Sequence, residues 1–332
     1  MHIGKFWIHV SCLILVARGA VAAQELFQFS KPEMGSLFQI RLYADNRDDA
    51  KRAAAAAFAR VEEINQIASD YLPESELSRL NKAPAFEPFA VSADLLVLLE
   101  KSLATARMTD GAFDITCAYA VQNWRRAKRQ KKLPTPEQTA RAMAMTDWRS
   151  LQLESDRHTV TKLKPGVLLD LGGIGKGYAA NEALLLLQKL GITRALVAAS
   201  GDIAIGDPPP EEEGWNIALR TFENPEESDK LIHIRAHNCG VSTSGDLHQF
   251  LELDGKRWSH IIDPKTGLGL TRRIACTVIA PTAFDSDALD TAMCIMGVER
   301  GLALIKKLPG YQARFVEMVG DALRTSKSAG FP

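Results

Sequence analysis

Apolar and polar residues alternate over residues 37–42, which predicts a half-buried β-strand close to the start of the chain. The period then changes, because apolar side chains recur at helical spacing over residues 58–67. The helix that carries them is expected to open at Asp48 or Asp49. Residues 92–108 repeat the helical pattern and predict a second amphipathic helix.

From residue 150 onward, short apolar runs are separated by turn residues, a pattern that is typical of β-strands. The expected strands cover residues 151–153, 159–161, 167–171, 195–199, 215–219, 231–234 and 274–280. Helical spacing returns at residues 178–190 and around residues 287–296. Many short strands with few helices predict an α+β domain that has a mainly antiparallel sheet and packed helices.

The composition is that of a globular protein, because 46% of the 332 residues are hydrophobic and 24% are charged. The 40 Lys and Arg residues balance the 40 Asp and Glu residues, so no overall field draws the chain to nucleic acid. The one dense basic run, residues 125–132, lacks interleaved aromatic side chains. It is therefore predicted to be a solvated helix end or a surface insertion, and no nucleic-acid partner is expected.

Residues 1–23 have the pattern of an export signal peptide. Lys5 supplies a positive charge, residues 6–17 are mostly apolar, and residues 20–23 form a small-residue cleavage region. The apolar run is shorter than the roughly 20 residues that a membrane span needs. We therefore expect a cleaved signal and an exported, periplasmic protein.

The last expected helix places Asp287, Asp290 and Thr291 at positions i, i+3 and i+4. Residues at this spacing are neighbours on one face of a helix. A set of oxygen donors suits a hard cation such as Mg²⁺ or Ca²⁺. The alternative is a charged first helical turn in which Asp285 or Ser286 is the N-cap.

A glycine-rich turn, residues 172–177, lies between the expected strand at 167–171 and the next helix. Backbone amides in such a turn can approach phosphate oxygens, and the helix N-terminus favours an anion. The turn fits the loose dinucleotide pattern GxGxxA, but no alternating strand and helix organisation surrounds it. A P-loop is excluded, because Gly177 rather than Ser or Thr follows Lys176.

Further along the chain, residues 200–202 and 242–246 form turns that follow apolar strand residues. His260 then enters a short apolar run that ends at Asp263-Pro264. A single histidine in such a place is either a satisfied structural residue or a group that transfers protons. Each of these features alone is ordinary.

Together, the residues of these motifs and their order along the chain resemble the ApbE family of FAD:protein FMN transferases over most of the chain. The matching segments are residues 34–36, 69–71, 75–81, 111–116, 170–180, 200–202, 242–246, 259–267 and 286–292. Ser36 and Ser286 depart from the Thr and Ala that are common in the family. Each segment alone is not specific to the family, but the occurrence of all of them in this order is.

The resemblance implies a set of site residues. The metal ligands would be Asp287 and Thr291, with Asp290 and the backbone carbonyl of Gly173 as further ligands. The FAD contacts would come from Met34, Asp70, Tyr71, Leu72, Asp114, Lys176 and Ile261. His260 would serve the transfer chemistry. The base that takes the proton of the attacking hydroxyl would be His260, with Asp287 or another nearby carboxylate as the alternative.

The implied fold is the tunnelling-fold (T-fold) α+β architecture of this family, as one flavin transferase domain over residues 24–332. The implied reaction is the Mg²⁺-dependent transfer of the FMN part of FAD to a Thr or Ser hydroxyl of an acceptor flavoprotein, which releases AMP. Two alternatives stay open, namely hydrolysis of FAD to FMN and AMP, and a non-catalytic periplasmic flavin-binding protein. A membrane-associated acceptor, and with it association with the inner membrane, also stays open.

Overall fold

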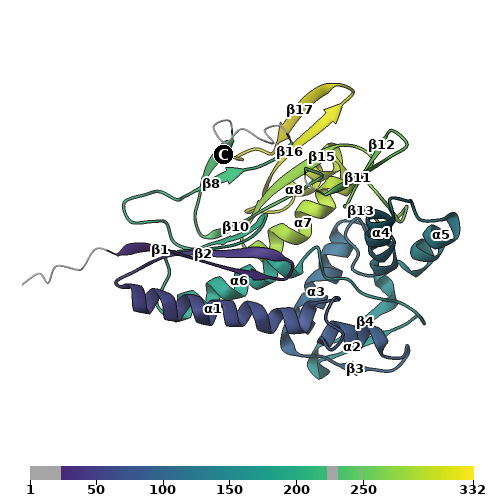
Figure 1. The fold of residues 1–332 in the computed structure, drawn as a ribbon, viewed down its shortest axis with the longest axis horizontal. Helices are drawn as coiled ribbons and strands as arrows, with labels where there is room; N and C mark the ends of the chain where they lie inside the picture. The colour runs from purple at the N-terminus through teal and green to yellow at the C-terminus, as the bar shows by residue number, and fades with distance from the viewer. Residues whose placement is uncertain (1–23, 223–230, 248) are drawn as a thin grey trace, which may run out of the picture.

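The structure, a computed structural model, describes residues 24–222, 231–247 and 249–332. A mainly antiparallel sheet with packed helices confirms the predicted α+β class (Figure 1). The predicted signal peptide lies outside the described residues. Among the helices of the described ranges, none combines the length and the apolar composition that a bilayer span requires.

The centre of the molecule is an antiparallel sheet of eight strands in the order β1-β2-β6-β7-β10-β15-β16-β17. These strands are β1 (Glu25–Glu33), β2 (Ser36–Ala44), β6 (Ala195–Ala199), β7 (Asp202–Ile205), β10 (Cys239–Gly245), β15 (Ile274–Ala280), β16 (Gln312–Val319) and β17 (Ala322–Lys327).

Smaller antiparallel pairings surround the central sheet. They join β3 (Phe89–Ala90), β5 (Thr159–Lys162) and β4 (Leu151–Glu154), β8 (Trp215–Leu219) with β9 (Ile232–Ala236), β11 (Phe250–Leu253) with β12 (Lys256–Ser259), and β13 (Ile262–Asp263) with β14 (Leu268–Gly269).

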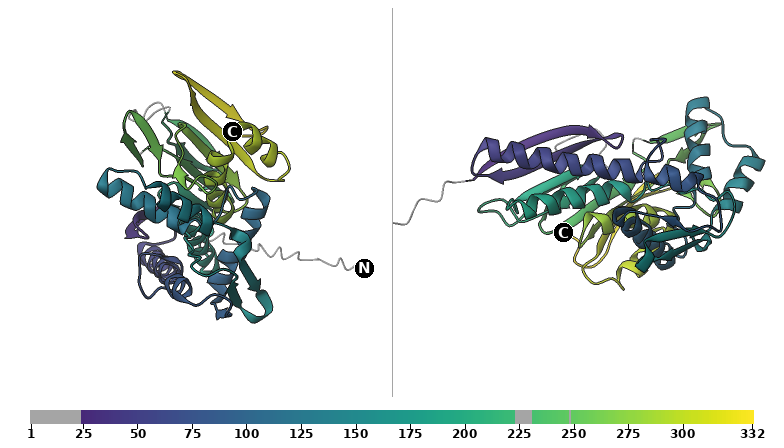
Figure 2. Two further views of the ribbon diagram at one scale, coloured as in Figure 1. Left: turned by 90° about the vertical axis from the view of Figure 1, so that its right-hand side faces the viewer. Right: turned by 90° about the horizontal axis from the view of Figure 1, so that it is seen from below.

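Three helices lie side by side against one face of the central sheet (Figure 2). They are α1 (Arg47–Ala68), α6 (Gly175–Lys189) and α7 (Ala283–Met296), and α8 (Val298–Ile305) follows α7. The remaining helices occupy the right-hand end of the molecule in Figure 1. They are α2 (Glu76–Lys82), α3 (Ala93–Met108), α4 (Ala118–Gln130), α5 (Pro136–Met145), and the 3-10 turns η1 (Trp148–Ser150) and η2 (Ser155–Arg157).

The core between the sheet and α1 follows directly from the two predicted periods. In β2, Phe38, Ile40 and Leu42 are fully buried while Leu37 is exposed, as the alternation predicts. The buried side of α1 is rich in small side chains such as Ala50 and Ala57, which let the helix approach the sheet closely. Burial of each large apolar side chain contributes about 1.5–3 kcal/mol to this packing.

The opposite face of the sheet is covered by the β8–β9 hairpin. Trp215 and Ile234 of the hairpin pack in one buried cluster with Leu196 and Val241 of the sheet. Every residue of the central strand β15 is therefore buried, on both faces. This double burial explains why its sequence is a continuous apolar run rather than an alternating one.

The expected strand at residues 167–171 is wrong, because this segment pairs with a side chain and not with another strand. The Asn81 amide donates to the Leu169 carbonyl at 2.9 Å and accepts from the Leu169 N–H at 2.7 Å. The Asp170 N–H donates to the carbonyl of Ile115 at 2.8 Å. An apolar run looks the same in sequence whether its partner is a strand or an amide side chain.

Two further differences concern the N-cap of α7 and the edge strand β1. The N-cap of α7 is Thr282, whose hydroxyl accepts from the Asp285 N–H at 3.1 Å, so Asp285 and Ser286 are not the cap. Asp287 therefore lies in the second helical turn. Strand β1 had no predicted counterpart, because Pro32 and its charged neighbours hide an edge strand that forms by pairing with β2.

Candidate active site

The start of α6 and the second turn of α7 meet at Gly177. A β-carbon at Gly177 would lie 2.3 Å from the Ala283 carbonyl oxygen and 2.5 Å from Asp287 Cβ, so no other residue fits this crossing. The Gly177 N–H donates to Asp287 Oδ2 at 2.7 Å. The first N–H groups of a helix lack partners within the helix, and α6 has no side-chain N-cap of its own. Asp287 therefore caps α6 from the neighbouring helix.

Three buried carboxylates gather around one lysine beside this crossing. They belong to Asp202, Asp287 and Asp290, and Lys176 Nζ forms an ion pair with Asp202 Oδ2. Burial alone would lower the pKa of Lys176, but the carboxylates of Asp202 and Asp287 outweigh burial and raise that pKa. We call this group the Lys176 cluster; fully ionised, it has more negative than positive charge.

The excess of negative charge shifts the pKa values of the two α7 carboxyls. Burial, and then the charge of Asp202, raises the pKa of Asp287 to about 7 against the opposing effect of Lys176. Burial and the charges of Asp202 and Asp287 raise the pKa of Asp290 well above its usual range. Buried carboxyls that share one site disfavour each other's ionised form. The cluster therefore favours an additional positive charge.

The other predicted metal ligands adjoin these carboxyls. Thr291 Oγ1 lies 3.2 Å from Asp290 Oδ1 and 3.3 Å from Ser244 Oγ. A β-carbon at Gly173 would lie 4.0 Å from Thr291 Oγ1, which places the glycine turn beside the same face of α7. Within the described ranges, no group of three or more His, Cys, Asp or Glu side chains is arranged as a metal site. A site here would therefore need the Thr291 hydroxyl and the Gly173 carbonyl.

His260 is held in one tautomer by the backbone of Gln249. Its Nδ1 lies 3.1 Å from the Gln249 carbonyl oxygen, which also accepts the backbone N–H of His260 at 3.0 Å. A carbonyl only accepts, so Nδ1 carries the proton in the neutral ring and Nε2 has a free lone pair. Burial lowers the pKa of His260, and the charges of Lys176 and Lys128 lower that pKa further. The imidazole is therefore a neutral base near pH 7.

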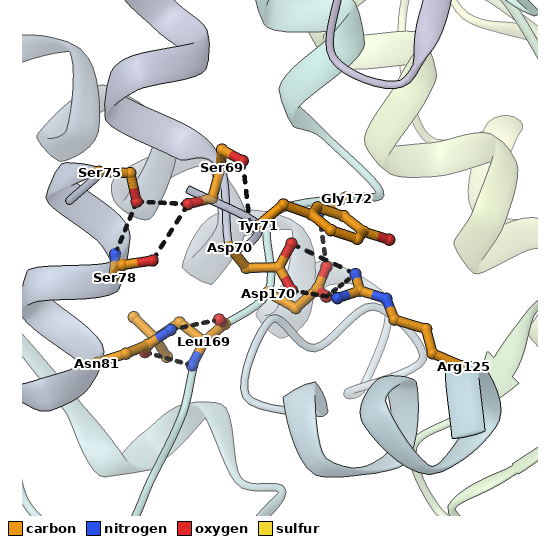
Figure 3. Close-up of polar contacts among 10 residues, drawn as sticks. All are labelled: Ser69, Asp70, Tyr71, Ser75, Ser78, Asn81, Arg125, Leu169, Asp170 and Gly172. Carbon is orange, nitrogen blue, oxygen red and sulfur yellow. Dashed lines mark hydrogen bonds and ion pairs between the residues drawn. The ribbon is translucent and has the colours of Figure 1, made fainter. Parts of the chain in front are cut away.

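An arginine of α4 contacts the loop that carries Asp70, Tyr71 and Leu72, through the Asp70 carboxylate (Figure 3). The guanidinium of Arg125 pairs with Asp70 and donates to Asp170 Oδ2 at 2.9 Å. Asp170 Oδ1 in turn accepts the N–H of Gly172 at 2.8 Å, so the same contacts hold the start of the glycine turn. We call this group, Asp70, Arg125 and Asp170, the Arg125 cluster.

Two of the predicted FAD contacts, Asp114 and Ile261, have polar groups that hydrogen-bond within the protein. The Asp114 carboxylate accepts the N–H and the hydroxyl of Thr116 at 2.8 and 2.6 Å, and also the N–H of Trp148 at 3.0 Å. The Ile261 side chain is buried, and its N–H donates to Ser259 Oγ at 3.0 Å.

Met34 lies in the tight turn between β1 and β2, with φ 49°. A β-carbon at Gly175 would lie 3.6 Å from its Cε, so Met34 reaches the first residue of α6. Among the predicted site residues, Met34, Asp287 and Thr291 lie against residues 173–177, and Asp70 is joined to Asp170 through Arg125.

Three residues that help to build the site were not predicted as members of it. Asp202 is the first residue of β7, and its position in the Ser-Gly-Asp turn was the one signal in the sequence. Asp170 is the first residue of the matching segment 170–180, but neither it nor Arg125 gave a signal for their pairing, which joins segments far apart in the chain. The basic run is a solvated helix end for Arg126, Lys128 and Arg129, as predicted, but Arg125 turns inward.

Comparisons with known proteins agree on one family. The model of the ApbE family matches residues 34–315. A FAD:protein FMN transferase of Escherichia coli (strain K12) is 32% identical over 292 residues, which cover 85% of this chain and 82% of that protein. A FAD:protein FMN transferase of Klebsiella pneumoniae (strain 342) is 30% identical over 304 residues, which cover 90% of this chain and 86% of that protein.

Solved structures are similar over almost the whole chain. The flavin transferase ApbE from Vibrio cholerae superposes with a TM-score of 0.81 at 28% identity, covering 93% of this chain and 98% of that chain. The apo form of the Pseudomonas stutzeri flavinyl transferase ApbE superposes with a TM-score of 0.80 at 26% identity, covering 92% and 95%.

Proposed function

The chain belongs to the ApbE family, and on that premise we propose that it is a transferase that moves the FMN part of FAD onto an acceptor protein. The acceptor group is a Ser or Thr hydroxyl, the product is a phosphoester-linked flavin, and AMP is released. One observation carries the proposal: His260 is a neutral base whose Nδ1 is held by the Gln249 carbonyl, and it lies close enough for the charge of Lys176 to lower its pKa. Lys176 itself belongs to a cluster with an excess of buried carboxylates.

Mg²⁺ fits the oxygen donors that the Lys176 cluster and its neighbours Thr291 and Gly173 offer. The residues that would hold the ion are Asp287, Asp290 and Thr291, with the backbone carbonyl of Gly173. All of their donor atoms are oxygens, the ligand type of hard cations, and the raised pKa values of both carboxyls mark a local shortage of positive charge. A bound divalent cation supplies electrostatic stabilisation of the negative charge that develops on phosphate oxygens.

The chain's own residues bind the pyrophosphate and transfer the proton. The N-terminus of α6 and the amides of the glycine turn favour an anionic pyrophosphate. His260 Nε2 accepts the proton of the acceptor hydroxyl as its oxygen forms a bond to the FMN-side phosphorus. The bond from that phosphorus to the bridging oxygen breaks, and AMP leaves with the bridging oxygen. The proton on His260 then returns to solvent or to the AMP phosphate.

Incubation of the purified chain with FAD, Mg²⁺ and candidate acceptor flavoproteins of the same host tests this function. Covalent flavin on the acceptor, detected by intact mass, and AMP in equal amount are the expected products. FMN and AMP without a modified acceptor would instead establish hydrolysis of FAD. Intact FAD that stays bound in the presence of Mg²⁺ would establish a non-catalytic flavin-binding protein.

We also propose that transfer takes place after export, in the periplasm. The support is the pattern of residues 1–23 in the sequence. Intact-mass measurement of the protein from its native cell envelope tests this proposal, because a cleaved chain should begin near residue 24. A chain that retains residues 1–22 in the cytoplasm would contradict it.

A further inference from the structure

We propose that Arg125 is a positioning residue that holds the Tyr71 ring in place as a stacking surface for a flat aromatic ring of the nucleotide. The ligand named here, FAD, rests on the proposed function. Arg125 belongs to the basic run, residues 125–132, which the sequence predicts to be solvated.

The guanidinium of Arg125 is held by two carboxylates from separate parts of the chain. It pairs with Asp70, where one of the two N–H···O contacts measures 3.3 Å, and it donates to Asp170 Oδ2 at 2.9 Å. Only a planar group with several N–H donors satisfies two carboxylates at once in a fixed orientation. Arg125 therefore has one defined plane.

The guanidinium lies over the Tyr71 ring. The Cζ atom of Arg125 is 4.2 Å from the centroid of the Tyr71 ring, a stacking distance for a guanidinium on an aromatic face. Tyr71 is nevertheless 72% exposed. A guanidinium covers only one face of a ring, so the opposite face of Tyr71 is open to solvent. An ordered aromatic ring with one open face can stack on a planar ligand.

The backbone around Tyr71 is anchored independently, so the ring does not depend on Arg125 for the course of the loop (Figure 3). The Ser69 carbonyl accepts from the hydroxyls of Ser75 and Ser78 at the start of α2. The Tyr71 N–H donates to Ser69 Oγ at 3.2 Å. Arg125 therefore orients only two side chains of this loop, the Asp70 carboxylate and the Tyr71 ring.

The glycine turn is joined to the same framework. Asp170 connects Arg125 to the N–H of Gly172, and Asn81 of α2 holds both backbone groups of Leu169. The stacking surface and the segment expected to approach the pyrophosphate are thus held at a fixed spacing. A nucleotide that contacts both would bind with less loss of conformational freedom than one that must order them.

The test compares FAD binding and transfer in Arg125→Ala and Arg126→Ala. Arg126 is the adjacent, exposed arginine of the same helix and is the matched control for lost positive charge. We expect Arg125→Ala to weaken FAD binding about tenfold, the range for losing an aromatic stacking partner, with the rate at saturating FAD within about twofold of the parent. Arg126→Ala should bind FAD like the parent.

Arg125→Lys supplies a conservative variant that keeps the charge but has no flat face. It should pair with Asp70 or Asp170 and should restore only part of the FAD affinity. Thermal unfolding of each variant checks the fold. If Arg125→Ala does not fold, the comparison of Arg125→Lys with Arg126→Ala carries the test, because a purely electrostatic role predicts full affinity for the lysine variant.

A double-mutant cycle with Tyr71→Leu shows whether Arg125 acts through the ring. The exposed ring can be replaced at little structural cost. If Arg125 acts by holding Tyr71, the double variant should bind FAD no more than about twofold more weakly than the weaker single variant. Additive losses, or unchanged affinity in Arg125→Ala, would overturn the inference. A fall in the saturated rate at unchanged affinity would overturn it as well.

Two further measurements separate this inference from the proposed function. FMN and ADP each carry one of the two rings of FAD, so only the ligand that stacks on Tyr71 should lose affinity in Arg125→Ala. If the parent chain binds no FAD at all, the proposed function fails and this inference fails with it. If the parent binds and transfers normally while Arg125→Ala does the same, only the role of Arg125 is refuted.

Discussion

Two clusters of acidic and basic side chains flank the glycine turn, and they differ in how many carboxylates share one cation. In the Arg125 cluster, two carboxylates share one guanidinium, and Asp170 also accepts a backbone N–H. In the Lys176 cluster, three buried carboxylates share one ammonium, and the pKa of Asp287 rises to about 7. The first cluster has one more carboxylate than cation, and burial and the charge of Asp70 raise the pKa of Asp170, whereas the second cluster has two more carboxylates than cations. We assign positioning to the first and metal binding to the second.

The largest expected effect comes from removing a carboxylate of the Lys176 cluster. Asp287→Ala should abolish Mg²⁺-dependent transfer, because the metal loses a charged ligand. It should also cost about 1–2 kcal/mol of stability, because the Gly177 N–H at the start of α6 loses its acceptor. Transfer assays across a magnesium titration, paired with urea unfolding, measure both effects.

Asp287→Asn separates the metal role from the capping role in this comparison. The amide oxygen can still accept the Gly177 N–H, so most of the stability should return. The charge is lost, so transfer should remain absent. Normal transfer by either variant would refute the metal assignment. A variant that regains transfer together with stability would show that Asp287 is only a cap.

A smaller effect is expected at His260, which burial and the charge of Lys176 keep neutral. His260→Ala should slow transfer about 10²- to 10⁴-fold, the range for losing one positioned acid–base group, while FAD and Mg²⁺ bind nearly as before. Because burial lowers the pKa of His260, the parent rate should fall only on the acid side of the ordinary histidine pKa of about 6.5. Single-turnover rates at several pH values, with FAD affinity on the same preparation, check both points.

An unchanged saturated rate in His260→Ala would exclude the catalytic role. Weaker FAD binding with a normal rate would indicate that the ring packs against the ligand. A pH profile with its acid limb above the ordinary histidine pKa would mean that another group, such as Asp287 with its pKa of about 7, controls the proton.

The smallest effect is on thermal stability, and it depends on pH. Asp287 keeps its proton in the folded state up to about pH 7, whereas an unfolded Asp loses it near pH 4. The folded state thus binds more protons between these values, so without metal this residue makes stability fall as pH rises from about 4 to about 7. Asp287→Asn should flatten that part of the profile of Tm against pH.

Mg²⁺ at about a hundredfold excess over its Kd should raise the Tm of the parent by about 5 °C above pH 7. The rise should shrink as Asp287 takes up its proton at lower pH. Asp70→Asn, in the Arg125 cluster, should keep the rise, and Asp287→Asn should lose it. An equal rise in all three proteins would mean that Mg²⁺ binds elsewhere.

The sequence predicted the features that depend on neighbours along the chain. The alternation of β2, the period of α1 and the shared face of Asp287, Asp290 and Thr291 follow from the geometry of a strand or a helix alone. The Leu169 segment failed because its hydrogen-bond partner, Asn81, is a side chain remote in sequence.

The Arg125 cluster could not be predicted for a related reason. Arg125 has the same charge and the same basic neighbours as Arg126, and only the docking of α4 against the loop after α1 distinguishes them. The same holds for the cap that Asp287 provides to α6, which exists because Gly177 lets two helices cross closely. Long-range packing decided both.

The most direct test measures acceptor-bound flavin and AMP together in a single reaction with FAD, for the parent, Asp287→Asn and Asp70→Asn. With Mg²⁺, the parent should form both products in equal amounts, and with EDTA it should form neither. Asp287→Asn should form neither under both conditions, whereas Asp70→Asn should still form both in a Mg²⁺-dependent reaction at saturating FAD. Equal products from the parent in EDTA, or from Asp287→Asn in Mg²⁺, would contradict the assignment of metal-dependent flavin transfer to the Lys176 cluster.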